Sequence, residues 1–175
     1  MFHIEMVTNE SKDLDKIEAL NQRAFPINER RPLSVFLKDQ SGCSDFVAFY
    51  DDEEFCGFAC LLTWQDITHI LYFAIEESQR EKGYGSMALQ EMRKIHPGHR
   101  YIADIEQDSE AVENHEQRRK RKGFYMRNGY EETEVAYKWR KEKYEILSAG
   151  GTVTRQEFYN FWEYFDKVVT IFATY

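Results

Sequence analysis

The sequence has no apolar run long enough to cross a membrane and few residues suited to disulfide or metal chemistry. Its longest apolar stretches are well short of the roughly 20 residues that a membrane-spanning helix needs. Its first residues, MFHIEMVTNESKD, lack the basic stretch and apolar core of a signal peptide. Cys43, Cys56 and Cys60 follow no zinc-binding or redox spacing. We therefore expect a cytoplasmic protein with reduced thiols, no bound metal and no membrane partner.

Basic residues are also in deficit. The 175 residues include 23 Lys and Arg against 31 Asp and Glu, which gives a formal net charge of -8. Such a charge disfavours non-specific binding to nucleic acid, so we expect no nucleic-acid partner, and it suits an enzyme with a cationic substrate. With 42% hydrophobic and 15% aromatic residues, the chain can fill the core of one compact domain.

Hydrophobic periodicity predicts a domain that mixes strands and helices. Strands are predicted at residues 2–8, 44–50, 54–64, 67–77, 100–106, 132–140 and 143–151. Helices are predicted at residues 11–25, 32–39, 84–95, within 110–130 and at 154–169. Ser11 is the expected N-cap of the first helix, a break is expected near Gly123, and Thr154 with Glu157 forms a predicted capping box. This order predicts an α/β or α+β domain with a mixed sheet.

Two glycines stand one residue apart in the segment SQREKGYGSMA, residues 78–88. A predicted apolar strand precedes them and a predicted helix follows. Glycine lets a backbone approach a ligand closely, and the first amides of a helix have no partner within it. With the helix dipole, these amides form a site suited to a pyrophosphate. An ordinary strand-to-helix turn is the alternative that needs no ligand.

Two cofactors fit this segment. The spacing GxGxxA, which begins at Gly83, matches a dinucleotide fingerprint, and Asp104 and Glu106 lie about 20 residues further along, where a ribose-binding acid is expected. Residues 76–82, however, separate the strand from the first glycine, and no further strand–helix–strand units follow. The spacing RxxGxG, which begins at Arg80, instead fits a loop that binds the pyrophosphate of an acyl-CoA.

The RxxGxG loop between a strand and an amphipathic helix resembles the acyl-CoA loop of the GNAT superfamily of N-acetyltransferases. A second segment, FYMRNGYEET at residues 124–133, resembles the FYxxxGF segment in which the family's last major helix passes into the next strand. The order of predicted elements across residues 1–149 also matches the family's fold. The resemblance implies a single α/β (α+β) domain with a mixed, mostly antiparallel sheet flanked by helices. Residues 150–175 are then a C-terminal helical extension packed on the same domain.

The resemblance implies acetyl-CoA as the acyl donor, without a metal. The strand before the loop would pair with the pantetheine arm through Phe73, Ala74 and Ile75. The loop would wrap the pyrophosphate, mainly through backbone N–H groups, and a bulky side chain at Gly85 would occupy phosphate space. The implied loop residues are Arg80, Glu81, Lys82, Gly83, Tyr84, Gly85 and Ser86.

Three further positions are candidates for contacts with CoA. Asn114 corresponds to a helix-start asparagine that often contacts the pantetheine, although it lies further from the FYMRNGY segment than is usual in the family. In the basic run RRKRK, residues 118–122, Arg118 and Arg119 are expected at the 3′-phosphate or the adenine, and a solvent-exposed helix face is the alternative. His69, in an apolar strand, is assigned no role.

Tyr125 falls at the family's frequent general-acid position, and a core pair with Phe124 is the alternative. Attack by a free amine on the thioester expels a CoA thiolate, which a tyrosine within reach can protonate. The acceptor amine arrives protonated and needs a base. Glu106, at the end of its strand, is the first candidate and Glu29, in the loop FPINERRPL, is the second; either can instead be a surface acid.

We therefore predict an acetyl-CoA-dependent N-acetyltransferase that acts on a primary amine of a small molecule or peptide by direct attack in a ternary complex. No cysteine lies near the predicted motifs, so no covalent acyl-enzyme is expected. A non-catalytic acyl-CoA-binding or regulatory module is the alternative. The aromatic stripe of the C-terminal helix is expected to cap the sheet, with a homodimer interface or one wall of the acceptor pocket as alternatives. The stripe consists of Phe158, Phe161, Trp162 and Phe165.

Overall fold

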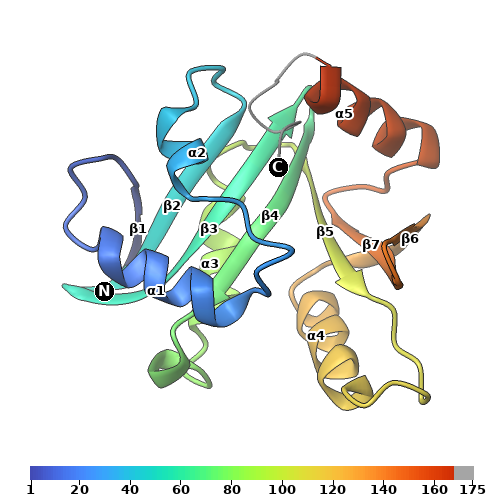
Figure 1. The fold of residues 1–175 in the computed structure, drawn as a ribbon, viewed down its shortest axis with the longest axis horizontal. Helices are drawn as coiled ribbons and strands as arrows, with labels where there is room; N and C mark the ends of the chain where they lie inside the picture. The colour runs from blue at the N-terminus through green and yellow to red at the C-terminus, as the bar shows by residue number, and fades with distance from the viewer. Residues whose placement is uncertain (168–175) are drawn as a thin grey trace.

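The computed structural model describes residues 1–167, in which seven strands form one sheet with helices on both faces (Figure 1). The strands are β1 (Phe2–Met6), β2 (Ser44–Asp51), β3 (Glu54–Trp64), β4 (Ile67–Ile75), β5 (Arg100–Glu106), β6 (Glu131–Trp139) and β7 (Glu142–Ala149). The helices are α1 (Leu14–Ala24), α2 (Ser34–Lys38), α3 (Tyr84–Met92), α4 (His115–Arg127) and α5 (Arg155–Lys167), with a short 3-10 helix η1 (Glu77–Gln79).

The sheet order is β1-β2-β3-β4-β5-β7-β6. Every neighbouring pair is antiparallel except β4 and β5, which are parallel. The predicted element order and the mixed, mostly antiparallel sheet are therefore confirmed. A dinucleotide-binding sheet is built from parallel strands joined by helices. The single parallel pair contradicts the dinucleotide interpretation of the glycine loop.

Two local predictions are wrong. Helix α1 begins after Asp13 rather than Ser11, because the Ser11 hydroxyl accepts a hydrogen bond from the Thr8 N–H (2.9 Å) and does not cap the helix. Helix α4 continues through Gly123 to Arg127. Burial of the helix face that carries the following aromatic residues outweighs the weak helix propensity of this one glycine.

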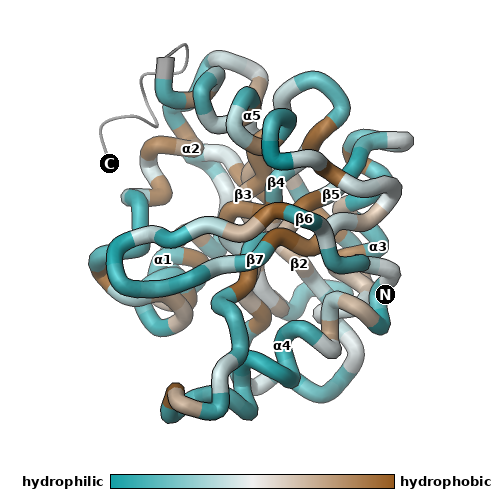
Figure 2. The backbone as a smooth tube through the Cα atoms, turned by 90° about the vertical axis from the view of Figure 1, so that its right-hand side faces the viewer, coloured by the Kyte–Doolittle hydropathy of each residue, from teal (hydrophilic) through white to brown (hydrophobic). Residues whose placement is uncertain are grey.

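Two hydrophobic cores lie on opposite faces of the sheet. Helices α1, α2 and α5 bury Ile17, Phe36 and Phe161 against one face. Helices α3 and α4 bury Leu89 and Tyr125 against the other face. Figure 2 shows the hydrophobic stretches gathered on the strands between these helices. Each fully buried large apolar side chain contributes about 1.5–3 kcal/mol of transfer free energy, so the sheet is fixed from both sides.

Strands β4 and β5 pair over only part of their length. The ladder joins Ile67–Ile70 to Arg100–Ala103. Within the described chain, residues 71–75 of β4 have no further partner on this side, and the two strands diverge in Figure 1. A bulge at Leu71 interrupts the register between β3 and β4 and bends the strand at this point. We call the region where β4 and β5 no longer pair the β4–β5 split.

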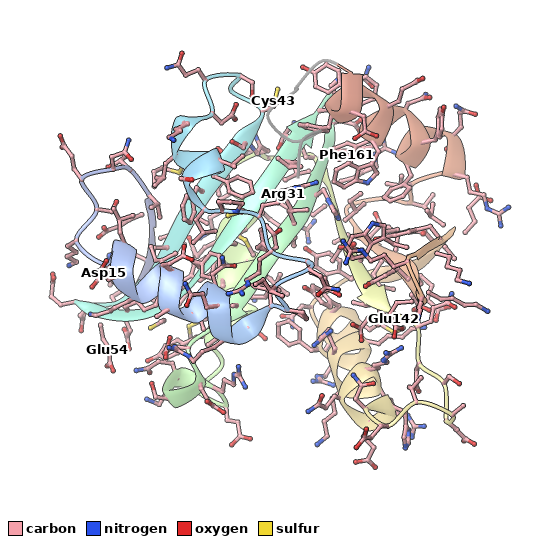
Figure 3. All side chains as sticks on the ribbon, viewed as in Figure 1. Asp15, Arg31, Cys43, Glu54, Glu142 and Phe161 are labelled. Carbon is pink, nitrogen blue, oxygen red and sulfur yellow. The ribbon has the colours of Figure 1, made fainter. Side chains whose placement is uncertain are left out.

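Helix α5 packs on the same sheet face as α1 and α2, where the rings of Phe161 and Trp162 lie against His69 of β4. The predicted capping box is confirmed, since the Glu157 N–H donates to Thr154 Oγ1 (3.2 Å) and the Thr154 N–H donates to Glu157 Oε2 (2.9 Å). Phe161 and Phe165 are fully buried, and Figure 3 shows Phe161 directed from the helix toward the sheet. The aromatic stripe thus packs on the sheet. The end of the predicted helix, residues 168 and 169, and the rest of the chain to 175 lie outside the described residues.

No helix within residues 1–167 is both long enough and apolar enough to span a bilayer. The boundary that we expect between residues 149 and 150 falls at the end of β7. A division of the chain there, and a homodimer, stay predictions.

Gly57 of β3 lies against β4, where an added Cβ atom would stand 2.2 Å from the carbonyl oxygen of Ala74. Gly57→Ala must therefore displace β4 or β3, and we expect it to lower the free energy of unfolding by about 2 kcal/mol. Urea denaturation measures the change.

Gly123→Ala is the matched control, because a Cβ atom there meets only the flexible end of Arg127 (3.1 Å). Alanine is favoured over glycine within a helix by about 1 kcal/mol, so this variant should gain stability. Similar losses in both variants would contradict the close approach of β3 and β4 at Gly57.

Candidate active site

The glycine loop joins β4 to α3 and presents a run of backbone amides. Glu81 and Gly83 both have left-handed backbone conformations, with φ of 64° and 83°, and Gly83 is the N-cap residue of α3. Among residues 1–167, the backbone N–H groups of 81–86 have no hydrogen-bond acceptor. Free amides at a helix N-terminus attract an anion through their N–H groups and through the helix dipole. The loop therefore fits the pyrophosphate of a nucleotide cofactor.

The two glycines of this loop have different surroundings, so the structure favours glycine at each position for a different reason. A Cβ atom at Gly83 would meet nothing within 4 Å, so the space in front of this residue is open. A Cβ atom at Gly85 would lie 3.1 Å from the ring of Phe124 on α4. Close packing between α3 and α4 thus gives a reason for glycine at position 85 that needs no ligand, and our expectation that a side chain there would fill phosphate space stays a prediction.

Side chains on the loop are anchored to the adjoining strands. The Tyr84 hydroxyl donates a 2.6 Å hydrogen bond to Asp51, and this bond, with a smaller effect of burial, raises the pKa of Tyr84 to about 12. Lys82 Nζ donates to Gln79 Oε1 (2.9 Å). Arg80 is exposed, and its Nε lies 3.5 Å from the Ile75 carbonyl oxygen. The side-chain hydrogen bonds of Lys82 and Tyr84 thus hold the loop in place, while its backbone amides stay unpaired.

The strand before the loop carries the three residues that we expect along the pantetheine arm. Phe73, Ala74 and Ile75 all lie on the part of β4 that has lost its pairing with β5. The Phe73 ring stacks against Phe124 at 6.4 Å between centroids. The backbone of this stretch therefore has hydrogen-bonding capacity on the side of the β4–β5 split. The role of these three residues in cofactor binding stays a prediction.

Tyr125 lies on the same face as the glycine loop. Its side chain is buried between the rings of Phe124 and Tyr130, with centroid distances of 5.3 and 5.2 Å. Burial raises the pKa of its phenol, the charge of Arg121 lowers it by less, and the charge of Asp104 adds a smaller increase. Asp104 lies on β5 and belongs to the opposite face of the sheet. The phenol is therefore protonated at neutral pH.

Glu29 lies on the opposite face, in the turn between α1 and α2. Its carboxylate is half-buried and accepts a 3.4 Å hydrogen bond from the Tyr144 hydroxyl of β7. Burial raises the pKa of Glu29, and the charge of Glu106 at the end of β5 raises it further, against the effect of the Tyr144 hydrogen bond. A carboxylate with a raised pKa is suited to accept a proton near neutral pH.

Glu106, our first candidate for the base, is already paired. Arg118 of α4 places its Nε 3.1 Å from Glu106 Oε2. The same guanidinium contacts Glu142 at 3.2 Å, the Gln107 carbonyl oxygen at 2.9 Å and Asn114 Oδ1 at 2.9 Å. Figure 3 shows Glu142 beside the end of β5, close to α4. Arg118 is thus a buried structural residue, and a contact between Arg118 and CoA is not supported by this geometry.

The other basic and polar positions of α4 are less constrained. Asn114 is the N-cap residue, but its side chain bonds Arg118 rather than a helix amide. Arg119 is largely exposed, with its Nε 3.6 Å from Asp108. Lys122 pairs with Glu132 and with Glu145. A solvent-exposed helix face therefore describes part of the basic run, and the predicted contact between Arg119 and CoA stays a prediction.

A polar group missed by the sequence reasoning spans three strands. His69 of β4, which we assigned no role, places Nε2 3.1 Å from Asp104 Oδ1 of β5, and the Tyr137 hydroxyl of β6 donates to Asp104 Oδ2 at 2.5 Å. Burial alone would raise the pKa of Asp104, but His69 and both hydrogen bonds outweigh it and hold the pKa below its usual value. Asp104 and Glu106 stand two residues apart on β5, so their side chains share a face of the sheet. This spacing is a signal in the sequence that could have placed Asp104 on the same face as Glu106.

Comparisons with known proteins agree with this fold. A family model described as an acetyltransferase (GNAT) domain matches residues 42–132, slightly more than half of the chain. No curated protein sequence matches the chain significantly. Among solved structures, an acetyltransferase ascribed to the GNAT family from Bacteroides thetaiotaomicron aligns with a TM-score of 0.77 at 18% identity, over 95% of this chain and 97% of that one.

Two more solved structures share the fold at lower similarity. The ribosomal-protein-S18-alanine N-acetyltransferase from Escherichia coli aligns with a TM-score of 0.61 at 16% identity, over 88% of this chain and 96% of that one. A GNAT family acetyltransferase from Elizabethkingia anophelis, solved with acetyl-CoA bound, aligns with a TM-score of 0.57 at 13% identity, over 85% and 97%. At these identities the likeness concerns the fold.

Asp104→Asn tests whether the group formed by His69, Asp104 and Tyr137 stabilises the folded chain. Because the pKa of Asp104 is lower in the folded than in the unfolded protein, its contribution is present above the unfolded pKa and is lost as pH falls through the folded pKa. We expect the variant to be less stable than the wild type at about pH 6, with a smaller difference at about pH 2.5.

Urea denaturation at the two pH values measures this difference. Tyr137→Phe, which removes one donor and keeps the charge of Asp104, should show a weaker form of the same dependence. A difference between Asp104→Asn and wild type that does not shrink on acidification would contradict the assignment.

Proposed function

Because the chain belongs to the GNAT family of acetyltransferases, we propose that it transfers an acetyl group from acetyl-CoA to a primary amine of a small molecule or peptide. The β4–β5 split carries this proposal. On one face of the sheet lies a loop of unpaired amides, and on the other lies Glu29, a half-buried carboxylate with a raised pKa. A donor held on one face can therefore meet an amine held on the other through the split.

The residues that would hold acetyl-CoA lie on the α3–α4 face. The free amides of residues 81–86 would bind the pyrophosphate, and the open space in front of Gly83 leaves room for it. The unpaired backbone of Phe73–Ile75 would bind the pantetheine arm as an added strand. Bound acetyl-CoA supplies an acetyl group as a thioester, which is activated toward attack by an amine.

Glu29 and Tyr125 are the proposed base and acid. Glu29 takes a proton from the incoming ammonium group, and its raised pKa makes it a stronger base than an ordinary surface glutamate. Tyr125 remains protonated because burial raises its pKa, so it can donate a proton to a thiolate that leaves. Glu106 is paired with Arg118 and acts on Glu29 through its charge, so Glu29 is favoured as the base.

Direct transfer in a ternary complex is favoured over a covalent acyl-enzyme. Cys56 and Cys60 are buried in β3, and burial raises the pKa of each thiol, which makes both poor nucleophiles. Cys43 lies before β2, where its Sγ is 3.5 Å from the Tyr164 hydroxyl of α5. None of the three belongs to the group formed by Glu29, Tyr125 and the glycine loop.

The class of acceptor follows from the charge of the acceptor face. Glu29, Asp104 and Glu106 share this face, and the chain has a net charge of -8. An amine arrives as a cation and is attracted by such a face. One structurally similar protein is named for acetylation of an alanine of a ribosomal protein. We propose an amine acceptor of either the peptide or the small-molecule kind.

A non-catalytic acyl-CoA-binding module is the second candidate function. It would share the loop of unpaired amides but would release no thiol in the presence of an amine. Glu29 and Tyr125 lie on either side of the β4–β5 split and the charge of Asp104 acts on both, which favours the enzyme.

Acetyl-CoA and CoA should raise the melting temperature of the protein, and NAD(H) should not. Gly83→Asp should weaken binding of acetyl-CoA by more than about tenfold, because it puts a negative charge beside the proposed phosphate site. A thermal-shift titration measures both effects.

Gly98→Asp is the matched control for backbone strain. Gly98 has a φ of 82° and, like Gly83, nothing within 4 Å of an added Cβ atom, but it lies in the turn before β5. It should bind acetyl-CoA as the wild type does. A rise in melting temperature with NAD(H) but not with CoA would contradict the proposed function.

Glu29→Gln and Tyr125→Phe should each slow acetyl transfer by about 100-fold while the dissociation constant for acetyl-CoA changes little. Thiol release across a panel of amines measures the rate. In the wild type, the rate should fall on the acid side as Glu29 is protonated, at a pH above the usual glutamate pKa of about 4.3.

This acid limb should be absent in Glu29→Gln. If Glu29→Gln keeps the wild-type rate and acid limb, another group is the base. If the wild type binds acetyl-CoA and releases no thiol with any amine of the panel, the binding-module alternative holds.

A further inference from the structure

The turn that carries Glu29 crosses toward the β4–β5 split from the face covered by α1 and α2 (Figure 1). Its own backbone supplies few hydrogen bonds. The N–H groups of Glu29 and Arg30 both donate to the Pro26 carbonyl oxygen, at 2.9 and 3.1 Å, which closes a single turn. Residues 26–33 therefore depend on contacts with the sheet for a fixed conformation.

Tyr72 of β4 supplies the first of these contacts. Its hydroxyl donates to the Glu29 carbonyl oxygen (2.8 Å) and accepts from the Arg31 N–H (2.9 Å). Its ring is buried and packs edge-on against Phe25 before the turn and Phe36 after it, with centroid distances of 5.0 and 6.0 Å. One side chain thus binds the backbone on both sides of Arg30, directly after the Cα atom of Glu29.

Tyr72 also lies at a defined place in the sheet. It follows the bulge at Leu71 and belongs to the stretch of β4 that has no partner on the β5 side. The two hydrogen bonds between Tyr72 and the backbone of the turn are therefore made on the β4 side of the β4–β5 split.

Tyr144 of β7 supplies the second contact, from the other side of the split. Its hydroxyl donates to Glu29 Oε1 at 3.4 Å. Its ring stacks on Tyr137 of β6 at 5.2 Å, and Tyr137 stacks on Phe158 of α5 at 5.6 Å. Since Tyr137 also donates to Asp104, the ring of Tyr144 is packed against a neighbour that is itself fixed.

We propose that Tyr72 and Tyr144 are positioning residues that hold Glu29 across the β4–β5 split, Tyr72 through the backbone of the turn and Tyr144 through the carboxylate. The proposal rests on the proposed role of Glu29 as the base. In this proposal Phe158 of α5 packs on Tyr137, Tyr137 packs on Tyr144, and Tyr144 holds the Glu29 carboxylate. Helix α5 then supports the site as well as covering the sheet.

Several charged groups and one hydrogen bond act on Glu29. The hydrogen bond from the Tyr144 hydroxyl is the one that can be removed without a change of charge. Glu106 and Asp104 on β5 raise the pKa of Glu29, whereas Arg140 in the turn between β6 and β7 and the Tyr144 hydroxyl lower it. Tyr144→Phe keeps the ring and its stacking and removes a donor to the charged carboxylate. The variant must therefore raise the pKa of Glu29, because the charged form loses a stabilising hydrogen bond.

The experiment is a titration followed by NMR on protein labelled at the glutamate carboxyl carbons, with the Glu29 signal identified by its loss in Glu29→Gln. In Tyr144→Phe we expect the pKa of Glu29 to move up by several tenths of a unit. In Tyr72→Phe we expect the Arg31 amide to exchange with solvent roughly tenfold faster, because its acceptor is gone. Turnover should then fall in both variants while the KM for acetyl-CoA stays constant.

Tyr50→Phe is the matched control. Tyr50 is a buried tyrosine of β2 whose hydroxyl bonds Asp13 at 3.0 Å, on the far side of β3 from β4. It should leave both the pKa of Glu29 and the exchange of the Arg31 amide as in the wild type.

The two proposals fail in different ways. An unchanged pKa of Glu29 in Tyr144→Phe, or unchanged Arg31 exchange in Tyr72→Phe, overturns the positioning role of that tyrosine whether or not the protein turns over. Thiol release that is absent in the wild type, or equal in wild type and Glu29→Gln, overturns the proposed function while both NMR readouts still report on the tyrosines.

Discussion

The loss of pairing between β4 and β5 is the constraint on which the site depends. In an uninterrupted sheet, the backbone hydrogen bonds of one strand are used by its neighbours and the two faces are separate. Here the parallel ladder ends at Ile70 and Ala103, and the bulge at Leu71 turns the rest of β4 away. The glycine loop and Tyr125 lie on one face of the sheet and Glu29 lies on the other, and in the proposed function this divergence joins them in one site.

The carboxylates of the acceptor face have different electrostatic surroundings. His69 and Tyr137 hold the pKa of Asp104 below its usual value, and Arg118 forms an ion pair with Glu106. Among the described residues, the hydrogen bond from Tyr144 (3.4 Å) and the charge of Arg140 favour the charged form of Glu29, but burial and the acidic neighbours outweigh them and raise its pKa. Fixed charges on β5 thus tune a titratable group on a turn, which is a common arrangement for an acid–base site.

The features predicted from the sequence are those that depend on local patterns. The element order follows from hydrophobic periodicity, the capping box at Thr154 follows from a three-residue spacing, and the glycine loop follows from two residues beside a helix start. The triad of His69, Asp104 and Tyr137 could not be predicted in the same way, because it joins three strands whose register is set by the whole sheet.

The errors have the same origin. Arg118 belongs to a basic run that suggests a solvent-exposed or phosphate-binding face, but tertiary contacts with Glu106 and Glu142 draw its guanidinium inward. Gly123 suggests a helix break, yet packing of the next residues against the sheet keeps α4 intact. The assignment of residues to acetyl-CoA stays a prediction, because it depends on a molecule that neither the sequence nor the fold contains.

Hydrogen–deuterium exchange with and without acetyl-CoA tests most directly whether the β4–β5 split joins a donor face to an acceptor face. We predict that acetyl-CoA slows exchange in residues 71–75 and 81–86 and leaves residues 26–33 unchanged, and that an amine acceptor added with CoA then slows exchange in residues 26–33. Protection by acetyl-CoA that falls outside β4 and the glycine loop, for example on β6 and β7 alone, would contradict the account.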